Sequence, residues 1–316
     1  MHHATLFERN ESNPILRAAD LPYPANSVFN AGVTEIGEET LLLVRVEDRR
    51  GISHLTVARS RDGVHSWRID PEPSLPPSPS THPEEIWGIE DPRITYLDEQ
   101  KLWAIAYTAY SSAGPLVSLA TTTDFRAFRR LGPVMPPEDK DAALFPVRFG
   151  GRWAMIHRPV STFPGAGAHI WLSFSPDLKH WGDHRVLLPA RQGGWWDANK
   201  VGLSPPPLRT PRGWLILYHG VRATSGGAIY RLGLALLDLD NPCRVLARSD
   251  DWVFGPEQPY ELFGDVGKVV FPCGWILQGD EIRLYYGAAD TCLALARARL
   301  SGLLAWLDEH CRHTFA

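Results

Sequence analysis

The sequence predicts an all-β fold, a five-bladed β-propeller that ends in a short C-terminal helix. Three observations lead to this prediction: five apolar runs of similar length, a second strand-like run after each of them, and turn residues at recurring positions. The unit recurs roughly every 50 to 60 residues, which is the period expected of propeller blades. An irregular β-sandwich is the alternative, but its strands rarely repeat with such constant length and order.

Each of the five runs is short and apolar and ends in a polar or aromatic group, as expected of a buried strand. They are TLLLVRVE (40–47), KLWAIAYTA (101–109), GRWAMIHRP (151–159), GWLILYHGV (213–221) and EIRLYYGAA (281–289). A second run follows each of them, and the pairs read as antiparallel hairpins. These second runs are SHLTVARS (53–60), PLVSLATT (115–122), HIWLSFS (169–175), RLGLALLD (231–238) and CLALARAR (292–299).

Turn chemistry supports the same repeat. Three second runs lead into a Ser, Thr or Asp turn followed by an aromatic residue, in SRDGVHSW (60–67), TTDFRAF (122–128) and SPDLKHW (175–181). The side-chain oxygens can accept hydrogen bonds from the turn backbone, and the ring can pack between sheets. The fourth unit, LLDLDNPCRVL (236–246), keeps the turn but lacks the ring.

The whole chain, residues 1–316, is predicted to form a single catalytic domain. Two proline-rich stretches, 71–83 and 203–211, resemble interdomain linkers, but in a propeller they serve equally well as loops between blades or around the cavity. The segment SGLLAWLDEH (301–310) has the apolar spacing of a terminal helix that packs on the outside.

Composition excludes several classes of function. A net charge of −4 offers no basic field for nucleic acid or for an anionic membrane, so any bound anion must meet local cations. The first residues lack the basic start and apolar run of a secretory signal, and no later run has the length of a membrane span, so the expected location is the cytoplasm. The four cysteines lack the spacing of metal ligands, so we expect no metal site and interpret them as buried free thiols.

Polar residues at the ends of the five apolar runs are candidates for the functional site. The first strand of each propeller blade lines the central channel, so if these runs are first strands their ends converge on one cavity. The residues concerned are Arg45 with Glu47, Tyr107, His157 with Arg158, His219, and Tyr286 followed by Asp290. Several cations in one pocket indicate a bound anion, with Lys200 as a further contributor; local pairing with carboxylates is the alternative.

The run EEIWGIEDPRITY (84–96) contains the candidate acid. Glu90 and Asp91 stand before a proline that fixes the local backbone, and on an extended strand only one of two adjacent residues can face the channel. From spacing alone, Asp91 is either the acid or a turn cap beside an Arg93–Glu90 ion pair. Some of the many aromatic residues nearby could stack on a sugar. They are Trp87, Tyr107, Tyr110, Trp195, Trp196, Tyr218 and Tyr230.

Ordered motifs along nearly the whole chain resemble those of the β-mannoside phosphorylases of glycoside hydrolase family 130, which are five-bladed β-propellers. The motifs include NSVFNAG (26–32), RVEDRRGISHL (45–55), GIEDPRIT (88–95), KDAALFP (140–146), HRP (157–159), KVG (200–202) and YYGAAD (285–290). Two places depart from the usual pattern, the loop KVGLSPPPL (200–208) and the pair Gly267–Lys268, which puts the fine substrate preference in doubt.

The resemblance assigns roles to individual residues. It implies that Asp91 is the sole catalytic acid, and it implies phosphate binding by Arg45, Arg158, Lys200 and His219, with Arg50 assisting. It implies sugar binding by Asn30, Asp141, Asp265, Phe271 and Asp290, and Arg93 is counted with these. No metal or organic cofactor is expected, since inorganic phosphate is the co-substrate, and a homo-oligomer is compatible with the resemblance.

One acid beside a basic cluster indicates phosphorolysis. A water-using inverting glycosidase needs a second carboxylate as base, whereas phosphate is already an anionic nucleophile that needs only cations to place it. We therefore expect cleavage of a terminal β-mannosidic bond of a mannooligosaccharide, with inversion, to give α-mannose 1-phosphate and a shortened acceptor. The alternatives are an inverting β-mannosidase of the same fold and a non-catalytic sugar-binding propeller.

Overall fold

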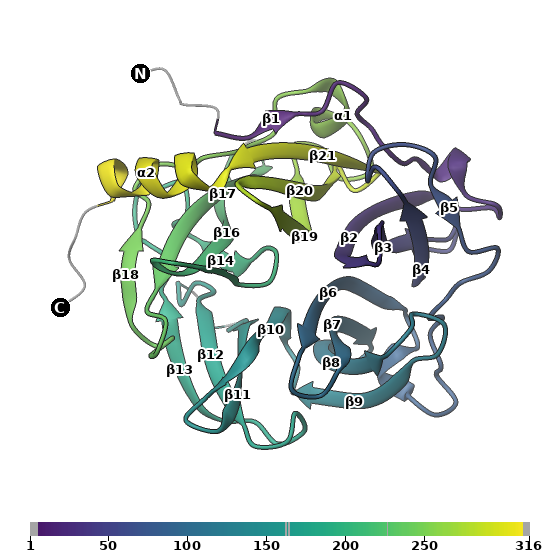
Figure 1. Ribbon diagram of the computed structural model, residues 1–316, viewed down its shortest axis with the longest axis horizontal. Coiled ribbons are helices and arrows are strands. Elements are labelled where there is room, and N and C mark those ends of the chain that lie inside the picture. Colours follow the sequence, from purple (N-terminus) through teal and green to yellow (C-terminus); the bar gives the residue numbers. More distant parts are fainter. Residues whose placement is uncertain (1–5, 162, 164, 226, 312–316) are drawn as a thin grey trace.

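Five antiparallel sheets stand around a common centre, as Figure 1 shows. The computed structural model describes residues 6–161, 163, 165–225 and 227–311. The predicted five-bladed propeller is confirmed. Neighbouring innermost strands contact one another, β19 with β2, β2 with β6, β6 with β10, and β10 with β14.

The blades follow one another along the chain, each from its innermost to its outermost strand. Blade 1 is β2 (Ser27–Ile36), β3 (Glu39–Glu47), β4 (Ser53–Ser60) and β5 (Arg68–Ile69); blade 2 is β6 (Ile89–Leu97), β7 (Leu102–Ser111), β8 (Gly114–Thr122) and β9 (Arg129–Met135). Blade 3 is β10 (Asp139–Phe149), β11 (Arg152–Pro159), β12 (Ile170–Ser175) and β13 (Gly182–Leu188).

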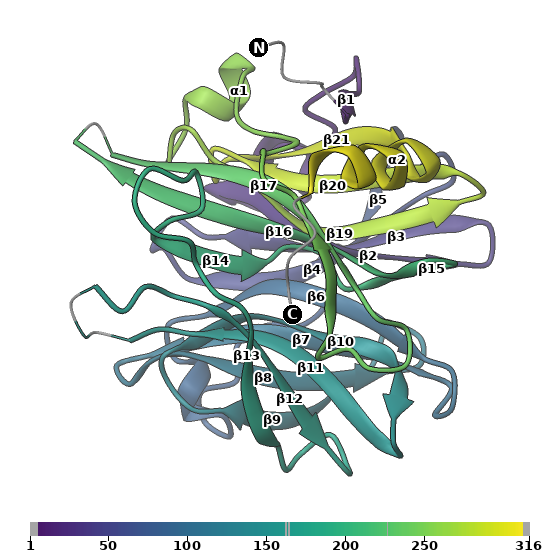
Figure 2. The ribbon, with the colours of Figure 1, turned by 90° about the vertical axis from the view of Figure 1, so that its left-hand side faces the viewer.

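The last two blades each have an addition. Blade 4 is β14 (Lys200–Leu203), β16 (Gly213–Thr224), β17 (Gly227–Leu237) and β18 (Val245–Arg248), and β15 (Leu208–Thr210) also pairs with β16. Blade 5 is β19 (Val270–Gln278), β20 (Glu281–Ala288) and β21 (Cys292–Arg299), and its outermost strand is β1 (Glu8–Arg9) from the other end of the chain. In Figure 2 the hairpin of β16 and β17 extends beyond the neighbouring strands.

The five apolar runs of the sequence are the second strands of the blades, not the first. They correspond to β3, β7, β11, β16 and β20. Both faces of such a strand are covered: in β3, Leu41 and Leu43 pack towards blade 2, while Leu42 and Val44 pack towards blade 5. Double-sided burial explains the continuous apolar signal. The true innermost strands carry polar residues around the channel, which hid them from a search for apolar runs.

The core consists of five large clusters of buried apolar side chains, one between each neighbouring pair of blades within the described residues. The predicted turns are confirmed, because Asp62, Asp124 and Asp177 each accept two backbone N–H groups of their turn. The first proline-rich stretch is a loop, as predicted, and leads into the short 3-10 helix η2 (Pro83–Glu85). The second connects β14 to β16 and is a loop apart from β15.

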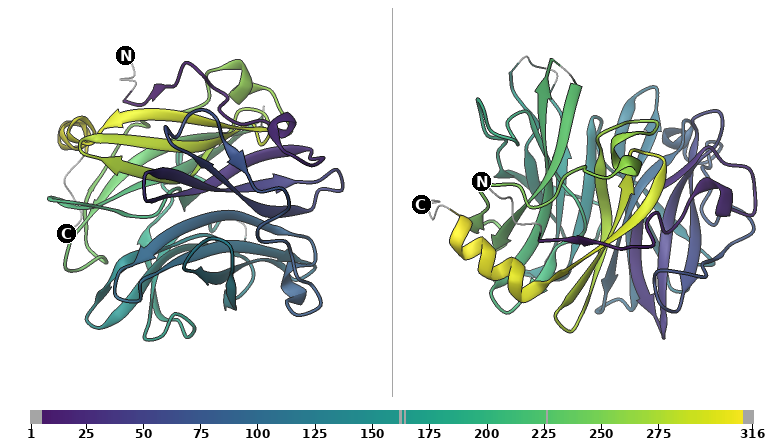
Figure 3. Two further views of the ribbon diagram at one scale, coloured as in Figure 1. Left: turned by 45° about the vertical axis from the view of Figure 1, so that its right-hand side comes forward. Right: turned by 90° about the horizontal axis from the view of Figure 1, so that it is seen from above.

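Helices are few and lie outside the blades, as Figure 3 shows for α2. The predicted terminal helix is α2 (Leu300–His310), whose Leu303 and Leu307 pack against the cluster between blades 4 and 5. The others are η1 (Ala18–Asp20) and α1 (Pro259–Leu262). None of the helices in the described residues is long and apolar enough to cross a membrane.

A buried ion pair holds β1 in the ring. Arg9 donates from Nε to Glu261 Oε1 at 2.7 Å and from Nη2 to Gly255 O at 2.6 Å, and its guanidinium lies 4.4 Å from the centre of the Phe254 ring. Glu261 is fully buried in α1 and also accepts the Tyr286 hydroxyl at 2.7 Å. The ion pair therefore ties the first strand of the chain to the last blade.

Replacing Arg9 with Met should destabilise the protein by about 3 kcal/mol, because Glu261 would lose its counter-charge while still buried. Urea unfolding followed by tryptophan fluorescence measures this loss. Arg68→Met is the matched control: Arg68 pairs with Glu39 on the surface, with 61% of its side chain exposed, and its loss should leave the free energy of unfolding nearly unchanged. If both variants lost the same small amount of unfolding free energy, Arg9 would not be the residue that holds β1 in the ring.

Candidate active site

A pocket of about 340 Å³ lies where the five blades converge, and it is the size of a small-ligand site. The structure brings most of the predicted site residues to it. The lining includes Asn30, Arg45, Asp91, Asp141, Arg158, Lys200, His219, Phe271 and Asp290.

Three predicted residues do not line the pocket. Arg50 is on the surface, with 75% of its side chain exposed, and it pairs with Asp48. Asp265 is exposed and accepts a hydrogen bond from Asn26 at 2.8 Å. Arg93 is buried beneath the pocket, where it donates to Leu203 O, Ser204 O and the backbone carbonyl of Asp91. The Arg93–Glu90 pair of the turn-cap alternative is absent from the ion pairs of the described residues, and Arg93 instead connects β6 to β14 and lies 3.5 Å from Asp141 Oδ1.

Not all strand-end residues converge as expected. Tyr107, His157 and Tyr286 are buried between blades, and they bond Glu85, Asp139 and Glu261 respectively. They lie on second strands, whose side chains partly point away from the channel. Arg45, Arg158, His219 and Asp290 do line the pocket, whereas Glu47 pairs with Arg45 outside the lining. The expectation was therefore right for these four lining residues and wrong for Glu47 and the three buried ones.

Asp91 lies at an irregularity in β6 that turns two adjacent side chains into the pocket. The pairing of β6 with β7 shifts between Glu90 and Arg93, and Asp91 has a φ of +52°. Such a bulge breaks strand alternation. Glu90 and Asp91 therefore both line the pocket, and the expectation that only one of them could do so was wrong.

A left-handed residue at an irregularity in strand pairing also occurs in the neighbouring innermost strands. Asn30 in β2 has a φ of +46° and Asp141 in β10 a φ of +58°, and each lies within a register shift. Asp290, after β20, has a φ of +49°. Asn and Asp tolerate the left-handed region better than other side-chain-bearing residues. Left-handed backbone thus presents four polar side chains to one cavity.

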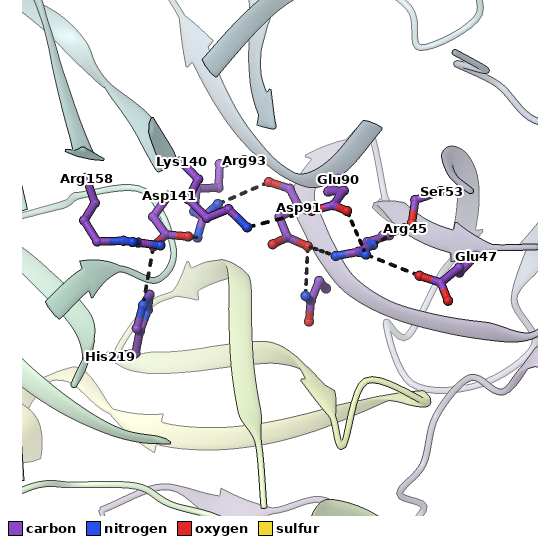
Figure 4. A network of polar contacts seen from close by, with 11 residues as sticks. Arg45, Glu47, Ser53, Glu90, Asp91, Arg93, Lys140, Asp141, Arg158 and His219 are labelled. Atoms are coloured by element: carbon purple, nitrogen blue, oxygen red, sulfur yellow. Dashed lines mark hydrogen bonds and ion pairs between the residues drawn. The ribbon is translucent and has the colours of Figure 1, made fainter. Parts of the chain in front are cut away.

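Arg45 is paired on the same side of the pocket as Asp91. Figure 4 shows its guanidinium among three carboxylates. Nη1 donates to Asp91 Oδ1 at 3.0 Å, and Nη2 contacts Glu90 Oε1 at 3.1 Å and Glu47 Oε2 at 3.4 Å. Asn30 Nδ2 donates to the same Asp91 oxygen at 2.8 Å. The local-pairing alternative therefore holds for Arg45.

Two carboxyl groups of the pocket have opposite pKa shifts. Burial raises the pKa of Asp91, but the charges of Arg45, Lys140 and Arg93 outweigh it, and the pKa falls below the ordinary value. Burial raises the pKa of Asp290 to about 7, because Arg45 only partly offsets it and the charge of Asp91 adds to it. In the empty pocket Asp91 is ionised, and Asp290 holds its proton up to neutral pH.

A second ion cluster surrounds Asp141. Its Oδ2 accepts from Arg158 Nε at 2.7 Å and lies 3.4 Å from His219 Nε2. Gly202 permits this approach, because a Cβ there would collide with both Asp141 and His219. Burial lowers the pKa of His219, against the attraction of Asp141. Burial also opposes ionisation of Asp141, but Arg158 and His219 hold its pKa well below the ordinary range.

Lys140 is a cation that the sequence interpretation missed. It lines the pocket, and its Nζ lies 4.0 Å from Glu90 Oε2. It stands next to Asp141 in the motif KDAALFP, which was a usable signal. Glu90 and Tyr230 were considered from the sequence but not selected, and both line the pocket.

The pocket has two chemically different sides. The acid wall consists of Asn30, Asp91 and Asp290, from blades 1, 2 and 5, with Arg45 bonded to Asp91. The cation wall consists of Lys140, Arg158 and Lys200, from blades 3 and 4, together with His219, whose lowered pKa leaves its imidazole neutral at pH 7. In Figure 4, Arg158 and His219 lie on one side of Asp91, and Arg45 lies on the other. A carboxylic acid opposite a cation cluster can serve acid-assisted displacement by an anion.

Comparisons with known proteins cover nearly the whole chain and lead to one family. The family model of glycoside hydrolase family 130, described as beta-1,4-mannooligosaccharide phosphorylase, matches residues 7–309. The chain is 33% identical over 311 residues to beta-1,4-mannooligosaccharide phosphorylase of Ruminococcus albus, covering 96% of this chain and 91% of the relative. It is 34% identical over 358 residues to beta-1,2-mannobiose phosphorylase of Listeria innocua, covering 95% and 98%.

A solved structure shows the same likeness. It is that of beta-1,2-mannobiose phosphorylase from Listeria innocua in complex with beta-1,2-mannobiose, which has a TM-score of 0.87 and 32% sequence identity. The match covers 96% of this chain and 99% of the other. With its fold, its ordered motifs and the family model in agreement, this chain belongs to glycoside hydrolase family 130, the family of the mannoside phosphorylases.

Proposed function

We propose that the protein is an inverting glycoside phosphorylase that cleaves the terminal β-mannosidic bond of a mannooligosaccharide with inorganic phosphate. The observation that carries this proposal is the opposition of Asp91 to the cation wall across one pocket. The names of the relatives from Ruminococcus albus and Listeria innocua support the same reaction.

The reaction balances with these groups alone. A phosphate oxygen attacks the anomeric carbon from the cation wall, the bond to the bridging oxygen breaks, and a proton from Asp91 neutralises that oxygen. The products are α-mannose 1-phosphate and a shortened acceptor sugar. Arg158, Lys140, Lys200 and His219 orient the phosphate, and no metal or organic cofactor enters the reaction.

Phosphate binding can itself prepare Asp91 as the acid. Arg45, and after it Lys140 and Arg93, lower the pKa of Asp91 against the effect of burial. A bound phosphate dianion would screen these cations and add negative charge, and both effects raise the pKa of a nearby carboxyl. Arg45 stays a predicted phosphate ligand, and we propose in addition that its bonds to Ser53 and Asp91 hold and orient the acid.

Hydrolysis is the less suitable reaction for this pocket. An inverting hydrolase needs a carboxylate base opposite the acid to activate water. The buried carboxylate on the cation wall is Asp141, which is already bound to Arg158 and close to His219. Cations opposite Asp91 suit an anionic nucleophile better than water.

We further propose that the protein acts in the cytoplasm, where the phosphate co-substrate is abundant. Cys273 and Cys292 are buried free thiols, which are typical of a reducing compartment. A homo-oligomeric state is also compatible with the proposal.

Phosphate should be required for turnover. Incubation with β-1,4- and β-1,2-mannobiose should release mannose 1-phosphate with phosphate present and almost no free mannose without it, as measured by anion-exchange chromatography. Free mannose formed equally well without phosphate would indicate a β-mannosidase. Binding of the sugars without any turnover would indicate a sugar-binding propeller.

Asp91→Asn is the control for this reaction. The variant should lose about 10³-fold in kcat, because it removes the proton and little volume. Its phosphate binding, measured by calorimetry, should persist.

Lys200→Ala should raise the KM for phosphate about tenfold and change the KM for the mannoside much less, because it removes one cation from the anion site. Steady-state kinetics with each substrate varied in turn separates the two values. Arg50→Ala is the matched control and should stay within about twofold of the wild type, because Arg50 pairs with Asp48 outside the pocket. If Arg50→Ala raised the KM for phosphate more than Lys200→Ala did, the assignment of Lys200 to the phosphate site would be wrong.

Asp290→Asn should stabilise the free protein at high pH. Because the folded-state pKa of Asp290 is raised to about 7, folding favours its protonated form, and that stability is lost as the pH rises through 7. The variant should therefore melt on the order of 2 °C above the wild type at pH 8.5. The difference should vanish near pH 4. Thermal unfolding without phosphate measures both, and a pH-independent difference would contradict the raised pKa.

A further inference from the structure

Two aromatic rings are exposed beside the mouth of the pocket. Trp87 is 45% exposed and Tyr110 is 38% exposed, and their ring centroids lie 5.3 Å apart at an interplanar angle of 71°. Ile86, which precedes Trp87, is 51% exposed. Contiguous exposed apolar side chains of this kind mark binding surfaces.

The sheet of blade 2 holds both rings in place. The backbone N–H of Trp87 donates to Tyr110 O at 2.9 Å, and the N–H of Tyr110 donates to Gly88 O at 3.1 Å. These bonds extend the pairing of β6 with β7 beyond Ile89, its first paired residue. The sheet therefore holds both rings in a fixed position, so less conformational entropy is lost when a ligand binds to them.

The same strands connect the pair to the pocket. Tyr110 is the cross-strand partner of Pro115, which lines the pocket, and Glu90, three residues after Trp87, also lines it. The tip of the β7–β8 hairpin packs towards Glu138, another lining residue, since a Cβ on Gly114 would lie 3.3 Å from Glu138 Cγ. Trp87 and Tyr110 thus stand at the end of blade 2 next to two lining residues, and Gly88, beside Trp87, packs against Ser53 of blade 1.

Other aromatic residues considered as sugar platforms are less available. Tyr107, Trp196 and Tyr218 are buried. Trp195 is 37% exposed, but the Arg191 guanidinium lies 4.4 Å from the centre of its ring. Tyr230 lines the pocket itself.

We propose that Trp87 and Tyr110 bind a mannosyl unit of the acceptor chain, beyond the unit adjacent to the cleaved bond. This rests on the proposed function, which places the terminal mannose inside the pocket. The rest of the chain then extends past Pro115 and Glu90, the lining residues on the strands that carry the two rings. A sugar presents C–H faces that stack on aromatic rings and hydroxyls that bond polar groups at their edge.

The test compares a short with a long substrate. With phosphate saturating, Trp87→Ala and Tyr110→Ala should lower kcat/KM about tenfold for a mannotetraose of the linkage that the wild type cleaves. The value for the mannobiose of that linkage should change much less, because the disaccharide ends before the pair. Trp87→Phe should recover most of the mannotetraose value. Trp195→Ala, which replaces a ring of similar exposure outside this pocket, is the matched control and should leave the ratio of the two values unchanged.

Three results would overturn the proposal. Equal losses for both substrates would show a structural defect, and an unchanged mannotetraose value would show that the chain does not contact the rings. A smaller molecular mass of Trp87→Ala in light scattering, with the substrate ratio unchanged, would assign the rings to an interface between copies of this chain. Failure of the proposed function is distinct from these, since the wild type would then not phosphorolyse the mannobiose either.

Discussion

The pairing of buried charges around Asp91 is the interaction on which the site depends. A carboxylate and a guanidinium removed from water are tolerated only when each has a partner and its remaining hydrogen bonds are satisfied. Asp91 meets this condition with Arg45 and Asn30, and Asp141 meets it with Arg158. Arg45 and Asn30 belong to blade 1 and Asp91 to blade 2, and His219 of blade 4 lies 3.4 Å from Asp141 of blade 3, so these contacts also fix how the blades stand relative to one another.

The same charges make the pocket suited to binding an anion. The lowered pKa of Asp91 shows that cations dominate its surroundings before any ligand arrives. A bound phosphate would offset part of this positive charge and so favour protonation of Asp91, which couples the acid to the presence of the nucleophile. Such coupling discourages protonation of the glycosidic oxygen without phosphate, and therefore opposes wasteful hydrolysis.

The sequence predicted the hairpins, the terminal helix and most of the pocket, because these leave strong local patterns. Two-sided burial gives β3 an unbroken apolar run, and the turn Asp62 has an unmistakable spacing from its ring Trp67. The innermost strands were missed because their polar residues and bulges break both the apolar run and the alternation. The bulge at Asp91 likewise caused the error about Glu90, since register is a property of paired strands and not of one segment.

The role of each residue was harder to predict from the sequence than its presence in the pocket. The motif containing Arg45 located it correctly in the pocket, yet its partners lie 45 and 46 residues away in β6, and only the packed structure reveals that it serves the acid. Arg50, five residues further along, shares the motif but extends into solvent beyond the end of β3. A motif therefore identifies which residues a family retains near a site. The packed structure adds the partners of each residue: Lys140 lines the pocket 4.0 Å from Glu90, and Arg45 lines it while bonded to Asp91.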